Sequence, residues 1–541
     1  MDTLNHKNWM PLIILLLSLN TLPLHIHAKS YSIELKSQNT LSVDAAYNFE
    51  RIMSKSENVW GEVADIDVEK IKECDTLCCH LKDHKFELIM VYNKQDDLYY
   101  YAHYVSENHN ADAIVSVLEN YIQIYLNSSD ENYIISSISD SEVAVVKYEA
   151  TWEMETEIND AFLSNDTTAN ISSIDTFRTD ETPIIRVLFL YTSSALGMMT
   201  APQQTSIKAE VYRYINEGNE SFVNSNINAR LQLAYLGPTT YDESQMSMDY
   251  IIAYFAGQGD GYIDEVHTLR NKYGADLCVL MINTEENLCG RAYAINANQY
   301  QAFSIIYPQY LGCGWRYSAI HELGHLVGCR HNRSYDGSSS PYQYGHGYIN
   351  CVSGNAWSTI MSYENSCDIY NERILHWSNP NVYYNGVATG TTTYENNARV
   401  WNERASTVSA FRNRGDTLFY TSSNNNTLAL FESIEAETRI TTSGGFEVQS
   451  GQTVEMHAPT IRLTANTHIK SGATFHASTS TSGNINTYPQ FEKRKTTNSI
   501  EDFPVMETNP LETTAAKILR NGELFIERDG RTYTVQGTLV R

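Results

Sequence analysis

Residues 321 to 331 read His-Glu-Leu-Gly-His-Leu-Val-Gly-Cys-Arg-His, and this run restricts the local fold more than any other part of the chain. His321 and His325 are four positions apart, so on a helix they share one face. On a continuous helix His331 would be rotated by about 240° from His325. A helix that ends at Gly328, which tolerates a left-handed turn, lets His331 return toward the other two.

Three imidazoles that converge in this way suit Zn²⁺ and leave the fourth coordination position of a catalytic zinc site for water. Glu322 lies one step round the helix from His321, outside the ligand stripe but within reach of such a water. We therefore expect His321, His325 and His331 to bind zinc and Glu322 to act as the general base. The alternative is a chance occurrence on a helix whose histidines are merely solvated.

A second motif, Ser358-Thr-Ile-Met-Ser-Tyr363, follows the histidines. Together the two motifs resemble the metzincin metallopeptidases, whose zinc helix is followed by a methionine-containing turn beneath the metal. Met361 matches that methionine. Tyr363 matches the tyrosine that stabilises the oxyanion in some members, so the resemblance implies that it is a second catalytic residue.

The closer resemblance is to bacterial reprolysin-like secreted proteases, and it covers roughly residues 182–413. It also rests on the segments Gly274-Ala-Asp-Leu-Cys-Val-Leu, Cys289-Gly-Arg-Ala and Trp377-Ser-Asn-Pro-Asn. Apolar strands at 184–191 and 277–282, separated by helical spacing near 207–215, favour an α/β sandwich. Asn332 departs from the family, since reprolysins usually carry Asp there and astacins Glu, which leaves substrate preference open.

An acidic block precedes this unit. Residues 29–181 carry 11 basic and 30 acidic residues, whereas the whole chain has 38 and 64. Strand-like runs at 86–93 and 98–105, followed by helical spacing of apolar residues over 114–126, predict a small α+β unit. A polar stretch at 164–181 reads as an exposed linker.

Its position before a complete catalytic unit makes the acidic block a candidate inhibitory propeptide, removed by cleavage near Arg178. Metzincin proforms commonly block the zinc with a Cys or an Asp. A permanent domain that binds substrate or aids folding is the alternative. The candidate blocking residues are Cys74, Cys78, Cys79, Asp175 and Asp180.

The N-terminus has the features of an export signal. A basic flank precedes an apolar run at 11–17, and the small residue Ala28 follows as a cleavage position. Polar residues and a proline interrupt the run before it reaches the ~20 residues of a membrane anchor, the alternative. We therefore expect a secreted, extracellular or cell-surface protein without a membrane span in the mature chain.

The C-terminal part predicts small all-β modules. Val448 to Ala458 partly recurs as Ile469 to Ala477, and Gly451 and Gly472 are 21 residues apart, as expected for short strands joined by glycine turns. The alternative is that the similarity of the two segments arose by chance. Residues 517–535 read as a hairpin or meander. The last residues resemble type IX sorting tails, which makes the secretion machinery a candidate partner, or else they form an accessory β-domain.

The chain has nine cysteines, and export permits disulfides. Six lie in the catalytic unit, where Cys289–Cys313 and Cys351–Cys367 are the preferred pairs and Cys278 reads as core. The cluster from Cys74 to His80 suits a metal poorly, because Cys78 and Cys79 are adjacent.

The sequence thus predicts a multidomain protein with an α+β prodomain, an α/β metzincin-like catalytic domain and small all-β modules. The expected divisions are a signal peptide at 1–28, a prodomain at 29–181, a catalytic domain at 182–413, a β-repeat module at 414–490, and a linker with a β tail at 491–541.

The expected function is that of a secreted zinc endopeptidase, made as an inhibited precursor and acting on proteins or peptides. A narrow zinc-dependent amidase and a non-catalytic surface binding protein are the alternatives. The net charge of −26 argues against nucleic acid and anionic membranes as partners. Ca²⁺ is a second candidate cofactor, but the sequence shows no ligand set for it.

Overall fold

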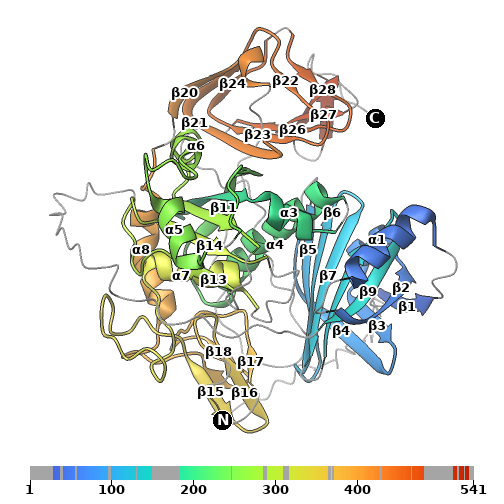
Figure 1. Ribbon diagram of the computed structural model, residues 1–541, viewed down its shortest axis with the longest axis vertical. Coiled ribbons are helices and arrows are strands. Elements are labelled where there is room, and N and C mark those ends of the chain that lie inside the picture. The colour runs from blue at the N-terminus through green and yellow to red at the C-terminus, as the bar shows by residue number, and fades with distance from the viewer. Residues whose placement is uncertain are drawn as a thin grey trace, which may run out of the picture.

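The computed structural model describes residues 29–36, 41–54, 58–95, 99–128, 131–148, 182–200, 202–244, 246–283, 289–308, 316–363, 367, 371–413, 415–425, 429–464, 466–479, 516–520, 523–528 and 531–534. In Figure 1 an N-terminal unit (blue and cyan) lies beside a central unit (green to yellow), and the C-terminal strands (orange) lie above the central unit. The predicted signal peptide, the linker at 164–181, residues 491–515 of the segment predicted as linker and β tail, and the candidate residues Asp175 and Asp180 lie outside the described residues. No helix in the described part combines the length and hydropathy of a membrane span.

The N-terminal unit, called the barrel below, is a closed sheet of nine strands. It closes because β1 pairs with β2 on one side and, in parallel, with β3 on the other. Its elements are β1 (Ser30–Lys36), α1 (Val43–Met53), β2 (Asn58–Asp65), α2 (Val68–Glu73), β3 (Thr76–Leu81), β4 (His84–Gln95), β5 (Tyr99–Ser106), β6 (Ala111–Leu118), β7 (Tyr121–Ser128), β8 (Asn132–Ser137) and β9 (Glu142–Tyr148).

The prediction of a helix over 114–126 is wrong, because these residues form the antiparallel pair β6 and β7. All eight residues of β6 are buried, since one face lines the barrel core and the other meets the central unit. A strand buried on both faces shows no polar alternation, so its apolar residues also fit helical spacing. Glu119, with a φ of 56°, makes the turn between the two strands. The predicted strands at 86–93 and 98–105 are confirmed as parts of β4 and β5.

The central unit is built on a mostly parallel sheet in the order β13-β14-β12-β10-β11. The predicted strands at 184–191 and 277–282 and the helix near 207–215 are confirmed. Its elements are β10 (Ile184–Tyr191), α3 (Ser193–Met198), α4 (Gln203–Asn224), β11 (Arg230–Pro238), α5 (Met248–Ala256), α6 (Glu265–Lys272), β12 (Leu277–Met281), β13 (Gly290–Ala292), β14 (Phe303–Ile306), α7 (Ser318–Val327), β15 (Ile349–Val352), β16 (Asn355–Ser358), β17 (Glu372–Arg373), β18 (Tyr383–Tyr384), β19 (Val387–Ala388) and α8 (Asn397–Val408).

Helices cover both faces of this sheet. Val187 and Phe189 of β10 belong to the core that contains α4, α7 and α8, whereas Leu188 and Leu190 belong to the core that contains α5 and α6. Successive side chains of a strand point to opposite faces, so one strand supplies both cores. The α/β sandwich expected from the sequence is therefore confirmed for this unit.

The C-terminal strands stack mainly in parallel, with the spacing that the repeat predicted. Thr453 lies opposite Thr474, and Glu447 opposite His468, so both pairs are offset by 21 residues. The meander at the end is also confirmed. The elements are β20 (Gly415–Tyr420), η5 (Ser422–Asn424), β21 (Phe431–Thr442), β22 (Glu447–Val448), β23 (Thr453–His457), β24 (Thr460–Arg462), β25 (His468–Ile469), β26 (Thr474–Ser478), β27 (Ala516–Arg520), β28 (Glu523–Arg528) and β29 (Arg531–Thr534).

These strands continue the central sheet. Strand β21 pairs antiparallel with the edge strand β11, with Leu236 opposite Phe431. A buried ion pair of 2.6 Å joins Arg186 of β10 to Glu435 of β21. The strands on either side of the division expected at 413/414 therefore belong to one hydrogen-bonded sheet.

Candidate metal centre and active site

The helix that carries the first two histidines ends where the sequence predicts. Gly328, directly after α7, has a φ of 124°, a value that favours glycine. The amides of Gly328 and Cys329 both donate to the carbonyl oxygen of Gly324, at 3.0 and 2.9 Å, and close the helix end. The chain then turns back and brings His331 to the face of α7 that carries His321 and His325.

The three imidazoles meet at their Nε2 atoms. The Nε2 atoms of His321 and His325 lie 3.1 Å apart, and that of His331 is 3.1 Å from His321 and 3.0 Å from His325. All three side chains are buried. Together they form a group that could hold a metal ion.

The chemistry of the donors fits a metal. The Nδ1 atom of His321 is 2.8 Å from the carbonyl oxygen of Ile360, and that of His325 is 2.9 Å from the carbonyl oxygen of Cys329. A carbonyl oxygen only accepts, so each Nδ1 carries the proton, and each Nε2 presents a lone pair to the common centre. Lone pairs this close repel unless a cation lies between them, and neutral imidazole nitrogen is a preferred ligand of Zn²⁺.

Met361 lies beneath this helix. A Cβ atom added at Gly324 would be 2.8 Å from the Sδ atom of Met361 and 2.7 Å from the ring of Trp377. Both side chains are fully buried. The glycine between the two histidines therefore lets α7 rest directly on the turn that contains Met361.

Tyr363 stands beside the third histidine. Its hydroxyl is 3.0 Å from Nε2 of His331, and the centroids of the two rings are 4.3 Å apart. Asn332, the residue that departs from the family pattern, holds this arrangement through its side-chain oxygen, which accepts from the amide of Tyr363 at 3.1 Å. Its Nδ2 donates to the hydroxyl of Ser334 at 2.7 Å.

Glu322 lies next to the outermost described strand at this end of the sheet. A Cβ atom added at Gly290 of β13 would be 2.8 Å from Oε1 of Glu322, so only glycine permits the close approach. A cavity of about 20 Å³ opens at this point, enough for a water-sized group. Its lining comprises Cys289, Gly290, Ser318, His321, Glu322, Tyr363 and Arg373.

Sequence reasoning missed Arg373. Its side chain is buried, and its two terminal nitrogens donate to the carbonyl oxygens of Ser362, at 2.7 Å, and Arg316, at 3.1 Å. No motif marks this residue, and only its place shortly after the methionine turn could have drawn attention to it. The close contacts of Gly290 and Gly324 were also not foreseen.

The cysteine predictions can be compared with the structure in part. The disulfide Cys351–Cys367 is confirmed. Cys289 is disulfide-bonded, but its predicted partner, Cys313, lies outside the described residues. Cys278 is buried core, as expected.

The cysteines proposed as metal-blocking residues lie elsewhere. Cys74 and Cys79 belong to the core of the barrel, and burial raises the pKa of both thiols. Cys78, also a free thiol, alternates with Cys79 on strand β3 and is half-buried. Within the described residues, the group that could hold a metal consists of the three histidines, without a cysteine of the barrel.

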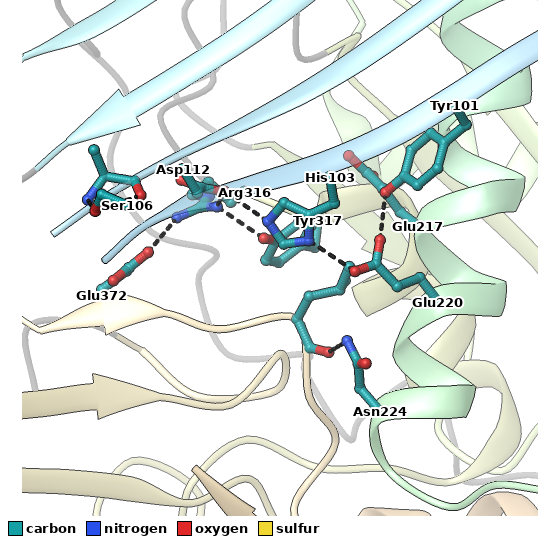
Figure 2. Close-up of polar contacts among 12 residues, drawn as sticks. Tyr101, His103, Ser106, Asp112, Glu217, Glu220, Asn224, Arg316, Tyr317 and Glu372 are labelled. Atoms are coloured by element: carbon teal, nitrogen blue, oxygen red, sulfur yellow. Dashed lines mark hydrogen bonds and ion pairs between the residues drawn. The ribbon is translucent and has the colours of Figure 1, made fainter. Parts of the chain in front are cut away.

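The barrel packs against the central unit through a buried polar network (Figure 2). On helix α4, the Oε2 atom of Glu220 accepts from the hydroxyl of Tyr101 at 2.8 Å, and its Oε1 lies 2.7 Å from Nδ1 of His103. The other ring nitrogen of His103 is 3.2 Å from Asp112, which in turn pairs with Arg316, two residues before α7. Strands β5 and β6 of the barrel thereby contact both α4 and the segment just before α7, the helix of His321 and His325.

The charges of this network shift the pKa values of its members. Burial alone would lower the pKa of His103, but Glu220 and Asp112 outweigh it and raise the pKa to about 10. Burial raises the pKa of Glu372, 3.0 Å from Arg316, to about 7. Burial would also raise the pKa of Asp112, but Arg316 and His103 hold it below its ordinary value. His103 is therefore a cation at neutral pH, between two carboxylates.

These features define a metallopeptidase fold and site, and comparisons with known proteins agree. Residues 181–378 match the sequence profile of the reprolysin-like type of metallopeptidase family M12. A peptidyl-Asp metalloendopeptidase of Stenotrophomonas maltophilia (strain R551-3) is 40% identical over 230 residues, which are 42% of this chain and 52% of that protein. The enzyme of the same name from Pseudomonas fragi is 33% identical over 196 residues, which are 36% of this chain and 100% of that protein.

The chain therefore belongs to the reprolysin-like metallopeptidases of family M12. A third relative, the peptidyl-Asp metalloendopeptidase of Xanthomonas campestris pv. campestris, is 38% identical over 229 residues, 42% of this chain and 52% of its own length. The chain thus spans about half the length of the Stenotrophomonas and Xanthomonas relatives that it matches.

Proposed function

We propose that this chain is a secreted zinc endopeptidase. His321, His325 and His331 would hold the zinc ion, and the convergence of their Nε2 atoms beside Glu322 is the observation that carries the proposal. Zinc, when bound, supplies a Lewis acid that acidifies water and polarises a carbonyl group. The confirmed Cys351–Cys367 disulfide supports export to an oxidising compartment.

The side chains of the protein have separate tasks in this reaction. Glu322 accepts a proton from the attacking water and passes it to the leaving amine, a task for which its carboxylate at the edge of the small cavity is well placed. Tyr363, 3.0 Å from Nε2 of His331, donates a hydrogen bond to the oxygen that becomes negative in the transition state.

The relatives suggest the kind of bond that is cleaved. The three relatives described above carry the name peptidyl-Asp metalloendopeptidase. The family profile that the chain matches covers residues 181–378, which include the site. We extend that name to this chain and propose cleavage of peptide bonds next to aspartyl residues. A narrow amidase and a non-catalytic binding protein remain the competing functions.

The barrel acts as an inhibitory propeptide in this proposal. Tyr125, Ile134 and Tyr148 of the barrel form one apolar cluster with Cys289 and Tyr307 of the central unit. Because Cys289 also lines the cavity beside Glu322, the barrel abuts the site itself. This contact supports inhibition by steric cover rather than by a cysteine ligand. A resident domain that aids folding is the alternative.

The test of the enzymatic proposal combines metal content with cleavage. The secreted protein is purified, its N-terminus is sequenced, and cleavage of a random peptide library is measured with and without a chelator. Glu322→Gln is expected to retain one zinc ion per chain and to lose turnover, because an amide does not accept the proton. Glu403→Gln, at the surface of α8, is the control and is expected to cleave normally.

The competing functions predict other results. Full turnover by zinc-loaded Glu322→Gln would remove Glu322 from the mechanism, and chelator-resistant cleavage would remove the metal. Hydrolysis of a small amide but of no peptide would favour the narrow amidase. A mature chain that begins near Lys29 and is fully active would make the barrel a resident domain.

A further inference from the structure

We propose that Arg373 is the residue that receives the side-chain carboxylate of the substrate aspartate. This inference rests on the proposed function, because it assigns a specificity-determining group to the site that contains Glu322. Arg373 is 2% exposed and lines the same small cavity as Glu322, His321 and Tyr363. Arg373 is the one arginine among the described residues that line this cavity, and none of them is a lysine. It therefore brings a permanent positive charge to the place where the bond is cut.

The backbone orients this guanidinium. Its two terminal nitrogens donate to the carbonyl oxygens of Ser362 and Arg316, which lie next to Tyr363 and shortly before α7 respectively. Two such contacts set the plane of the group, whose N–H donors form a planar fork. Its planar donor set matches the two oxygens of a carboxylate, whereas the ammonium of lysine acts as a point charge.

A second observation comes from the larger cavity of about 290 Å³ between the barrel and the central unit. Arg373 lines this cavity as well, together with Arg316, Glu372 and Asp112 of the barrel. The guanidinium of Arg316 in this cavity binds two carboxylates, those of Asp112 and Glu372. This wall of the site therefore already accommodates carboxylates, and Arg373 is the part of it that borders the cavity of Glu322.

Two matched peptides test the inference. They differ at one position, which carries Asp in one peptide and the neutral, nearly isosteric Asn in the other. The purified zinc-loaded enzyme is expected to prefer the Asp peptide by about 100-fold in kcat/KM. Arg373→Gln is expected to bring the ratio close to 1, mainly by slowing cleavage of the Asp peptide. Arg399→Gln, at an exposed arginine of α8 that pairs with Glu403 at 2.6 Å, is the control and is expected to keep the ratio.

Binding gives a readout that does not depend on turnover. In the Glu322→Gln background, the affinity for the Asp peptide should fall by about 100-fold when Arg373→Gln is added, while the affinity for the Asn peptide stays the same. If Arg373→Gln does not fold, Arg373→Lys replaces it and is expected to reduce the preference, because the planar donor pair is lost.

The outcomes separate the two claims. The assignment of Arg373 is overturned if the preference for the Asp peptide survives both Arg373→Gln and Arg373→Lys. It is also overturned if these substitutions lower kcat/KM equally for the Asp and Asn peptides. Cleavage by the wild-type enzyme without any preference for Asp overturns it too and leaves the endopeptidase standing. If the zinc-loaded wild type cleaves no peptide, the proposed function fails, and the binding measurement still decides on Arg373.

Discussion

The Nδ1 atom of His103 lies 2.7 Å from Oε1 of Glu220, so an imidazole from a barrel strand pairs with a carboxylate of helix α4 (Figure 2). The exposed fraction of His103 is 8% and that of Glu220 is 1%. A pair this deeply buried leaves an uncompensated charge when one partner is removed. The contact therefore ties the stability of the barrel to its position on the central unit.

The first prediction concerns this pair. His103→Gln removes the cation between two carboxylates and is expected to lower the free energy of unfolding of the full chain by about 3 kcal/mol. The measurement is denaturant unfolding. The control is His84→Gln, the same substitution at a more exposed barrel histidine 3.2 Å from Glu131, which should change stability by less than about 1 kcal/mol. Equal effects of the two substitutions would contradict the buried-pair interpretation.

The second prediction is the pH dependence of this interface. An unfolded histidine has a pKa near 6.5, and the pKa of His103 is raised to about 10, so its stabilising effect is complete below about pH 6.5 and is lost as the pH rises through about 10. Glu372 acts in the same direction between about 4.5 and 7, because its protonated form is favoured in the folded protein.

We therefore expect the melting temperature of the unprocessed chain to fall between pH 6 and pH 10. His103→Gln should flatten the part of this fall above pH 7. The measurement is thermal unfolding of the Glu322→Gln variant, which prevents self-cleavage, in buffers of equal ionic strength. The melting temperature of Glu322→Gln could instead rise toward pH 10, or it could fall identically with and without the added His103→Gln substitution. Either result would show that His103 does not hold its charge at the interface.

The sequence predicts those features of the fold that depend on residues close together in the chain, and it fails for features that depend on distant segments. The end of helix α7 at Gly328 and the return of His331 follow from spacing alone, because the helical repeat and the tolerance of glycine decide them. The repeat around Gly451 and Gly472 is equally local. The barrel is not, since its closure depends on the pairing of Ser30 to Glu34 with Thr76 to His80.

Burial on two faces explains the main failure. Strands β6 and β7 lie between the barrel core and the central unit, so the contrast between polar and apolar faces that identifies a strand is absent. Arg373 was missed for a related reason. A single arginine carries no spacing rule, and its role depends on a turn that brings it to Ser362 and Arg316.

The third prediction tests the packing under helix α7, which carries His321 and His325. Gly324→Ala would place a Cβ atom 2.7 Å from the ring of Trp377 and 2.8 Å from Sδ of Met361, so α7 must shift. We expect a loss of about 1–3 kcal/mol in stability and weaker zinc retention. Gly197→Ala in α3, where a Cβ atom meets nothing within 4 Å, is the control and should be neutral or slightly stabilising. Normal zinc affinity in Gly324→Ala would show that the turn does not support the metal site.

The fourth prediction concerns the hydroxyl of Tyr363. Tyr363→Phe is expected to lower kcat by about 100-fold while KM changes little, because the hydroxyl acts on charge that forms only in the transition state. The control is Tyr335→Phe, the same substitution in a ring whose centroid is 4.2 Å from that of Tyr363. Steady-state kinetics on one peptide give both constants. Identical kcat values for Tyr363→Phe and the wild type would leave Tyr363 as a structural residue.

The last prediction addresses Asn332, where this chain differs from the residues usual in reprolysins and astacins. Its side-chain oxygen accepts from the amide of Tyr363 at 3.1 Å, and its Nδ2 donates to Ser334 at 2.7 Å. Asn332→Asp keeps the acceptor, and the hydroxyl of Ser334 can rotate to donate to the new carboxylate. We therefore expect the zinc-loaded variant to retain most of its kcat/KM.

Asn332→Ala has no such compensation. It removes the acceptor of the amide of Tyr363 and is expected to cost about 1–3 kcal/mol in stability. It should also lower kcat, because Tyr363 is no longer held beside His331. Thermal unfolding and kinetics of the two variants, measured side by side, decide the point. If Asn332→Asp is as impaired as Asn332→Ala, the acceptor is not what matters at this position, and the donor contact with Ser334 must be the reason that an amide is needed here.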